Sequence, residues 1–120
     1  MYITAGEVVH QVSGQSWDDF IRARILTPLG MGQSNTSVRD LAGLPNVATP
    51  HAELAGEVKT IPWRNIDNAA AAGSINSNVT DMAKWLRLWI NRGMFEGKRL
   101  LSESTVREAI RPSSRSTTRR

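Results

Sequence analysis

The chain has 120 residues, of which 40% are hydrophobic and 22% charged, an ordinary composition for a single globular domain. It has no cysteine, which excludes disulfides and thiolate metal sites, and no apolar run reaches the roughly 18 residues of a membrane span. The net charge of +4 comes from residues 111–120, which carry four arginines and no acid. Without them acidic and basic side chains are equal in number, so the charge does not predict specific nucleic-acid binding.

Two helices are predicted first. Residues 3–12 predict a helix that places four apolar side chains near one another: Ile3, Val8, Val9 and Val12. Gly14 is suited to end this helix. Ser16 is placed to cap a second helix, and Pro28 with Gly30 is placed to end it. The expected buried stripe of this second helix is Trp17, Phe20, Ile21 and Ile25.

The middle of the chain has weaker signals. Residues 32–50 are rich in Gly, Ser, Asn and Pro and predict a loop, with one helical turn near residues 38–42. Two short extended runs flank Ala55-Gly56 and predict a small β-hairpin. Residues 63–77 are expected to be a connector.

The strongest helix signal begins after Asn78. Asp81 is the third residue of this predicted helix, the position whose backbone amide donates to a capping side chain. Gly93 is placed to end this helix. Its apolar side chains recur at helical spacing, which predicts one face made of Met82, Trp85, Leu86 and Trp89.

A last short helix is predicted after Ser102, with Val106 and Ile110 on one side and Pro112 as its stop; residues 95–98 before it form a turn. The fold class is therefore mainly α with a small β-hairpin. We expect residues 1–110 to form one helical subdomain. The Ser/Thr/Arg-rich residues 111–120 are expected to be a disordered tail.

Short motifs follow one another in two long stretches. The first stretch contains Ser13-Gly14-Gln15-Ser16-Trp17, then Pro28-Leu29-Gly30-Met31, then Thr36-Ser37. The second is "AAAAGSINSNVTDMAKWLRLWINRGMFEGKRLLSESTVREAI". In order and spacing, these motifs resemble the serine β-lactamase-like family, which includes class C β-lactamases, DD-peptidases and related esterases. The resemblance covers most of residues 2–110 and implies an excised helical subdomain of the β-lactamase-like fold.

The resemblance also implies where catalysis takes place. In the family, the active site lies between this subdomain and an α/β half, with a nucleophile in Ser-x-x-Lys. None of the eleven serines here is followed three positions later by lysine. Tyr2 corresponds to a structural tyrosine rather than to the family's Tyr-x-Asn. Ser74-Ile75-Asn76 and Lys59-Thr60-Ile61 resemble the second and third catalytic motifs, but they occur at the wrong places in the chain, so the catalytic residues stay unassigned.

A different chemistry is suggested by the two histidines. Glu7 and His10 are three residues apart on the first predicted helix, a spacing that bundles use to bind metals, and His51 with Glu53 projects from one side of a strand. Two copies related by a twofold axis would double the ligand count. A bound Zn²⁺ could then activate water for ester or phosphoester hydrolysis. The plain alternative is a set of solvated side chains.

Three functions therefore remain open: part of a serine hydrolase without its nucleophile, a Zn²⁺-dependent hydrolase formed by oligomerisation, or a non-catalytic interaction module. The family implies no required cofactor. Four tryptophans in a subdomain without its other half predict exposed apolar surface and a homo-oligomer, most simply a dimer. Residues 1–9 lack the basic region of a signal peptide, which predicts a cytoplasmic chain, although full-length relatives are often periplasmic or secreted.

Overall fold

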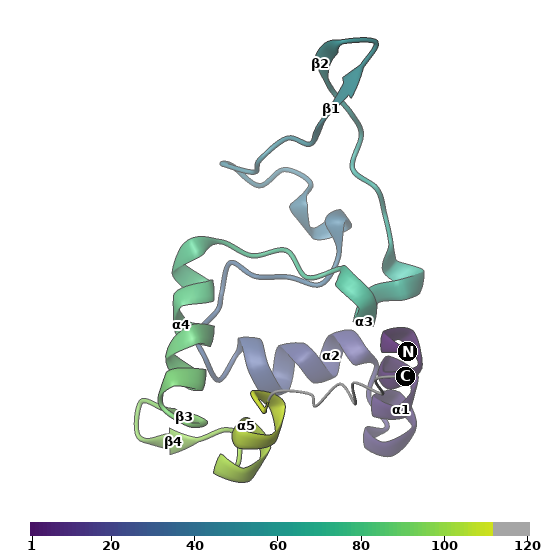
Figure 1. Cartoon of the computed structure of the whole chain (residues 1–120). Helices are drawn as coiled ribbons and strands as arrows, with labels where there is room; N and C mark the ends of the chain where they lie inside the picture. Colours follow the sequence, from purple (N-terminus) through teal and green to yellow (C-terminus); the bar gives the residue numbers. More distant parts are fainter. Residues whose placement is uncertain (112–120) are drawn as a thin grey trace, which may run out of the picture.

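The computed structural model describes residues 1–111, arranged as a helical body from which one β-hairpin projects (Figure 1). The helical segments of the body are α1 (Tyr2–Ser13), α2 (Trp17–Ile21), η1 (Arg22–Leu26), η2 (Val38–Leu41), η3 (Asp67–Ala69), α3 (Ala70–Gly73), α4 (Val79–Ile90) and α5 (Glu103–Ala109). The strands are β1 (His51–Leu54), β2 (Glu57–Thr60), β3 (Met94–Phe95) and β4 (Lys98–Arg99). The predicted class, mainly α with a small hairpin, is confirmed; the predicted tail lies outside the described residues except for Arg111.

Each of the three predicted helix caps forms as expected. The hydroxyl of Ser16 accepts a hydrogen bond from the amide of Asp19, and Asn78 accepts from the amide of Asp81. Ser102 accepts from the amide of Thr105. Each side chain satisfies one of the amides that a helix start leaves without an intrahelical acceptor, which fixes where the helix begins.

The second predicted helix changes its winding half-way. After α2, residues 22–26 adopt π-helical geometry, in which the amide of Thr27 donates to the carbonyl of Arg22 at 2.9 Å. The wider turn directs Leu26 and Leu29 into the core, where they are 5% and 1% exposed. The predicted stripe from Trp17 to Ile25 is half-buried, and its members Ile21 and Ile25 pack against the core.

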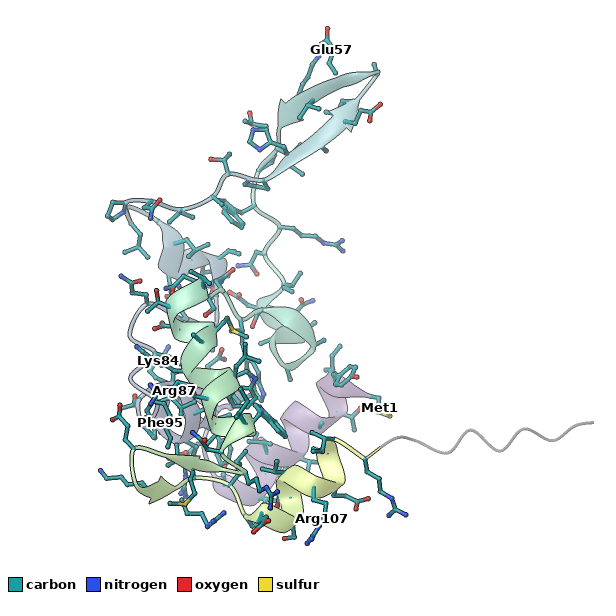
Figure 2. The ribbon with its side chains drawn as sticks, turned by 60° about the vertical axis from the view of Figure 1, so that its left-hand side comes forward. Met1, Glu57, Lys84, Arg87, Phe95 and Arg107 are labelled. Atoms are coloured by element: carbon teal, nitrogen blue, oxygen red, sulfur yellow. The ribbon has the colours of Figure 1, made fainter. Side chains whose placement is uncertain are left out.

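The core lies where α4 and the β3–β4 hairpin meet the end of η1. Its buried members are Leu26, Leu29, Met31, Leu88 and Phe95, with Trp85 and Leu101 among the half-buried side chains packed against them. The guanidinium of Arg87 lies over the ring of Phe95 at 5.3 Å, and Figure 2 shows the two side by side. This cation–π contact packs an exposed charged side chain against the edge of the core.

Two predicted apolar faces differ from the structure. On α4 the prediction is right in part: Trp85 packs against the core and Trp89 is half-buried, but Met82 and Leu86 are 40% and 56% exposed. The buried positions of this helix are Asp81 and Leu88. On α1 most of the predicted apolar side chains are exposed and the buried residue is Gly6, which lies against Ala71 of α3. A Cβ at position 6 would come within 2.6 Å of the Ala71 Cβ, so contact between α1 and α3 needs glycine there.

Other differences are smaller. On α5, Val106 is buried as expected but Ile110 is 67% exposed. The predicted connector contains the short helices η3 and α3, and the predicted turn at 95–98 is flanked by β3 and β4. Among residues 1–111, no helix has the length and apolarity of a membrane span.

Candidate functional site: a buried carboxylate and an open cleft

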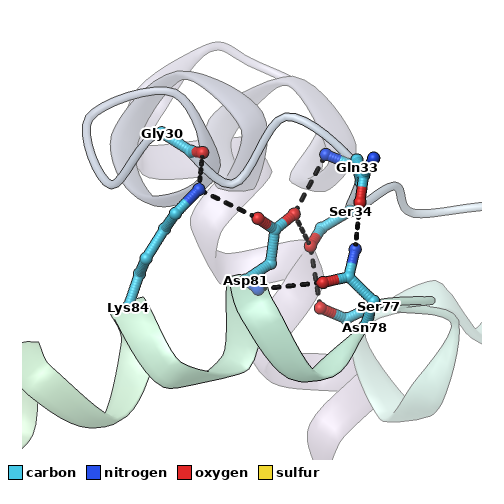
Figure 3. A network of polar contacts seen from close by, with 7 residues as sticks. All are labelled: Gly30, Gln33, Ser34, Ser77, Asn78, Asp81 and Lys84. Atoms are coloured by element: carbon cyan, nitrogen blue, oxygen red, sulfur yellow. Dashed lines mark hydrogen bonds and ion pairs between the residues drawn. The ribbon is translucent and has the colours of Figure 1, made fainter.

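Asp81 is the centre of a network that ties α4 to the segment after η1 (Figure 3). One carboxylate oxygen accepts from the Gln33 amide and the Ser34 hydroxyl, each at 2.9 Å. The other accepts from the Lys84 ammonium group at 3.1 Å. Asp81 is 2% exposed, so these contacts are shielded from water and hold residues far apart in the sequence.

The remaining contacts complete the network. Lys84 also donates to the carbonyl of Gly30, and the side-chain amide of Asn78 donates to Gln33 at 2.9 Å. Ser34 and Ser77 share a hydroxyl–hydroxyl bond of 2.8 Å. Throughout the described residues, every buried side-chain nitrogen or oxygen has a partner. We call this set the Asp81 clamp: Gly30, Gln33, Ser34, Ser77, Asn78, Asp81 and Lys84.

The electrostatics of the clamp favour an ionised carboxylate. Burial acts to raise the pKa of Asp81, but hydrogen bonds from Lys84, Ser34 and Gln33 outweigh it and leave the pKa below the ordinary 3.8. The Ser34 hydroxyl donates to this weakly basic carboxylate. A carboxylate held ionised by these donors is poorly suited to take a proton from Ser34.

A second carboxylate, that of Asp67 in η3, holds η2 in place. Asp67 accepts from the Asn65 amide and from the hydroxyl of Ser37, each at 2.9 Å, and lies 3.3 Å from the Arg39 guanidinium. Hydrogen bonds from Asn65 and Ser37 lower the pKa of Asp67. These contacts position η2 against η3 and so shape the loop that follows.

An open cleft of about 720 Å³ lies beside the segments that these two carboxylates hold. Parts of the 32–48 segment, residues 76–78, Arg22 and Trp63 line it. Its polar groups are mostly amides and hydroxyls, and its described lining contains no His, Lys, Tyr or Cys. Such a wall can hydrogen-bond a ligand, and Asp40 is the one carboxylate among its described lining residues.

The near-matches to catalytic motifs have structural surroundings. Ser74 is 4% exposed, and its hydroxyl donates to the Ala70 carbonyl at 3.1 Å. Asn76 pairs with Asn35 in an isolated antiparallel bridge. Lys59 lies on β2, 2.9 Å from Glu57. The structure therefore surrounds these residues with local contacts of the fold.

The four candidate metal ligands occupy two separate parts of the chain. Glu7 accepts from Gln11 on α1, and His10 bonds the carbonyl of Gln15. His51 and Glu53 share one side of β1, as predicted, on the projecting hairpin. Within residues 1–111, no three His, Cys, Asp or Glu side chains are grouped to hold a metal ion. A site shared between two copies stays a prediction.

Sequence comparison decides the family. The profile of the Beta-lactamase family matches residues 1–120. The chain belongs to the β-lactamase family. This confirms the resemblance drawn from the Pro-Leu-Gly-Met and Asp-Met-Ala-Lys motifs, whose residues Gly30, Asp81 and Lys84 meet in the clamp.

The relatives are considerably longer than this chain. Penicillin-binding protein 4 of Amycolatopsis lactamdurans is 32% identical over 109 residues, which are 88% of this chain and 28% of that protein. An unguisins hydrolase of Aspergillus violaceofuscus is 29% identical over 97 residues, 76% of this chain and 17% of that protein. The chain thus spans less than a third of either curated relative.

Solved structures share the fold. The octameric penicillin-binding protein homologue from Pyrococcus abyssi matches with a TM-score of 0.74 and 27% identity, over 88% of this chain and 22% of that chain. The D-amino acid amidase from Ochrobactrum anthropi matches with a TM-score of 0.72 and 23% identity, over 89% and 32%. The fold of this chain therefore recurs within both of these longer chains.

Proposed function

We propose that residues 1–111 form the helical wall of a β-lactamase-family hydrolase site and bind or orient substrate without supplying the nucleophile. The family match over the whole chain carries this proposal. The open cleft, which is lined in part by residues of the Asp81 clamp, supports it, because its amides and hydroxyls suit hydrogen bonding and lie beside apolar side chains. Without Ser-x-x-Lys, the acyl-transfer chemistry would need groups from outside these residues.

Covalent labelling tests the chemical half of the proposal. The chain is incubated with a fluorescent penicillin and, separately, with p-nitrophenyl acetate, and both intact mass and product release are measured. We expect no stable adduct and no turnover above buffer. An acylated serine, Ser34 or Ser77 above all, would show that the chain carries its own nucleophile and would overturn the proposal.

A chimera tests the scaffolding half. Residues 1–111 replace the matching segment of penicillin-binding protein 4, whose unmodified form is the positive control. We expect a folded chimera that is acylated by penicillin, and weaker acylation when Asp81→Asn is added, because the clamp positions the cleft wall. A chimera that folds by circular dichroism yet is never acylated would contradict this role.

A further inference from the structure

The β1–β2 hairpin is exposed on both faces. Val58 is 74% and Leu54 50% exposed, and the side chains of β2 are exposed throughout. Figure 2 shows Glu57 on this projection, away from the body that carries Lys84 and Arg87. A two-stranded hairpin alone is only marginally stable in water, and its open edges invite pairing with another strand.

The register shows which backbone groups face the open edge of β2. The turn residues Ala55 and Gly56 have φ values of 54° and 82°, as a tight two-residue turn of type I′ requires. The flanking residues Leu54 and Glu57 are partners, so they form the hydrogen-bonded pair next to the turn. Val58, one residue further on, therefore directs its N–H and C=O to the outer edge.

The charges of β2 are complementary to a second copy of the same strand. In an antiparallel pair centred on Val58, Glu57 of each copy lies opposite Lys59 of the other. Within one copy these two side chains form an exposed ion pair of 2.9 Å, so the same charges are available for exchange between copies. The two Val58 residues then exchange backbone hydrogen bonds at the twofold axis.

We propose that this chain dimerises through β2, giving a four-stranded antiparallel sheet in the order β1-β2-β2-β1. Two reciprocal Glu57–Lys59 pairs set the register, and the open β2 edge of each hairpin is covered. The pairing goes beyond the proposed hydrolase role and does not depend on it. It also differs from a dimer formed by apolar helix surface, which the exposed Val79, Leu86 and Ile90 of α4 would provide.

Charge exchange between variants tests the register. Glu57→Lys and Lys59→Glu are each expected to weaken dimerisation about tenfold. Because the dimer is twofold symmetric, each substitution replaces two cross-strand attractions by two repulsions between like charges. Mixing the two variants restores opposite charges at both positions across the axis. Sedimentation of a fluorescent copy should then show a mixed dimer at least as tight as the wild-type dimer.

Two further variants separate the hairpin from the helix surface. Val58→Pro removes the outward N–H without touching the bonds between β1 and β2, and it should weaken the dimer. Leu86→Gln with Ile90→Gln on α4 is the matched control and should leave the dimer intact. All variants are checked for unchanged circular dichroism.

Three results would overturn the pairing. The first is a wild-type chain that stays monomeric at every concentration. The second is a mixture of the charge variants that associates no better than each alone. The third is a dimer lost in the α4 variant but retained in Glu57→Lys, which would assign the interface to the helix.

Discussion

The Asp81 clamp and the β1–β2 hairpin both contain polar contacts, but those of the clamp centre on a buried carboxylate and those of the hairpin are exposed to solvent. Asp81 is 2% exposed and accepts from residues up to 48 positions away. The Lys59–Glu57 ion pair of the hairpin has side chains 55% and 72% exposed and joins neighbours on one strand. Shielded contacts between distant segments define the fold here, whereas exposed contacts leave an element available to other partners.

The largest effect should follow removal of the carboxylate. Asp81→Ala removes the shared acceptor of the Gln33 amide, the Ser34 hydroxyl and the Lys84 ammonium group. We expect a loss of about 3 kcal/mol in the free energy of unfolding, measured by urea denaturation. Glu57→Gln in the hairpin is the comparison, with an expected loss under about 0.5 kcal/mol. Equal losses would show that burial does not distinguish the two regions.

A smaller loss is expected from a methyl group at the α1–α3 contact. Gly6→Ala places a Cβ 2.6 Å from that of Ala71, and the helices must separate to accept it. The expected cost is about 2 kcal/mol in the same assay. Gly32→Ala is the matched control, because a Cβ there meets nothing within 4 Å and should leave stability unchanged. If both variants behave alike, the close approach of the helices is not what requires glycine at position 6.

Acid should weaken the clamp. Because the pKa of Asp81 is lowered in the folded state, its contribution is complete above the ordinary value of 3.8 and is lost as the pH falls through the folded pKa. We expect the midpoint of thermal unfolding to fall over that range. The fall should be reduced in Asp81→Asn, and an identical pH profile in that variant would assign the acid sensitivity to other carboxylates.

The smallest effect is expected in the hairpin turn. Ala55 has a φ of 54°, a conformation that asparagine adopts more readily than alanine. Ala55→Asn should raise the hairpin population, measured from amide chemical shifts, by a few tenths of a kcal/mol at most. The unfolding free energy of the body should not change. A matching gain in global stability would show that hairpin and body unfold together.

Local signals were sufficient for much of the fold. The caps at Ser16, Asn78 and Ser102 and the turn at Ala55-Gly56 were predictable, because each depends on residues within a few positions. The family was also predictable, because its motifs are contiguous in sequence.

Contacts between distant segments were harder to predict. Helix α4 has apolar side chains on two sides, and periodicity alone does not say whether Met82 or Leu88 meets the core. The clamp was missed for the same reason. Asp81 looked like a residue near a cap, and nothing local pairs it with Gln33 and Ser34; the one hint was Lys84 three residues later.

The π-helical segment at residues 22–26 has a consequence for how sequences of this family are aligned. One extra residue in a turn rotates the later side chains relative to those before it. Leu26 and Leu29 are buried in the core, whereas Ile21 and Ile25 pack against the same core half-buried. A relative that lacks the bulge would need a one-residue gap inside a continuous helix. Placing that gap in the loop after Met31 instead would shift the Pro-Leu-Gly-Met residues by one position and obscure their common origin.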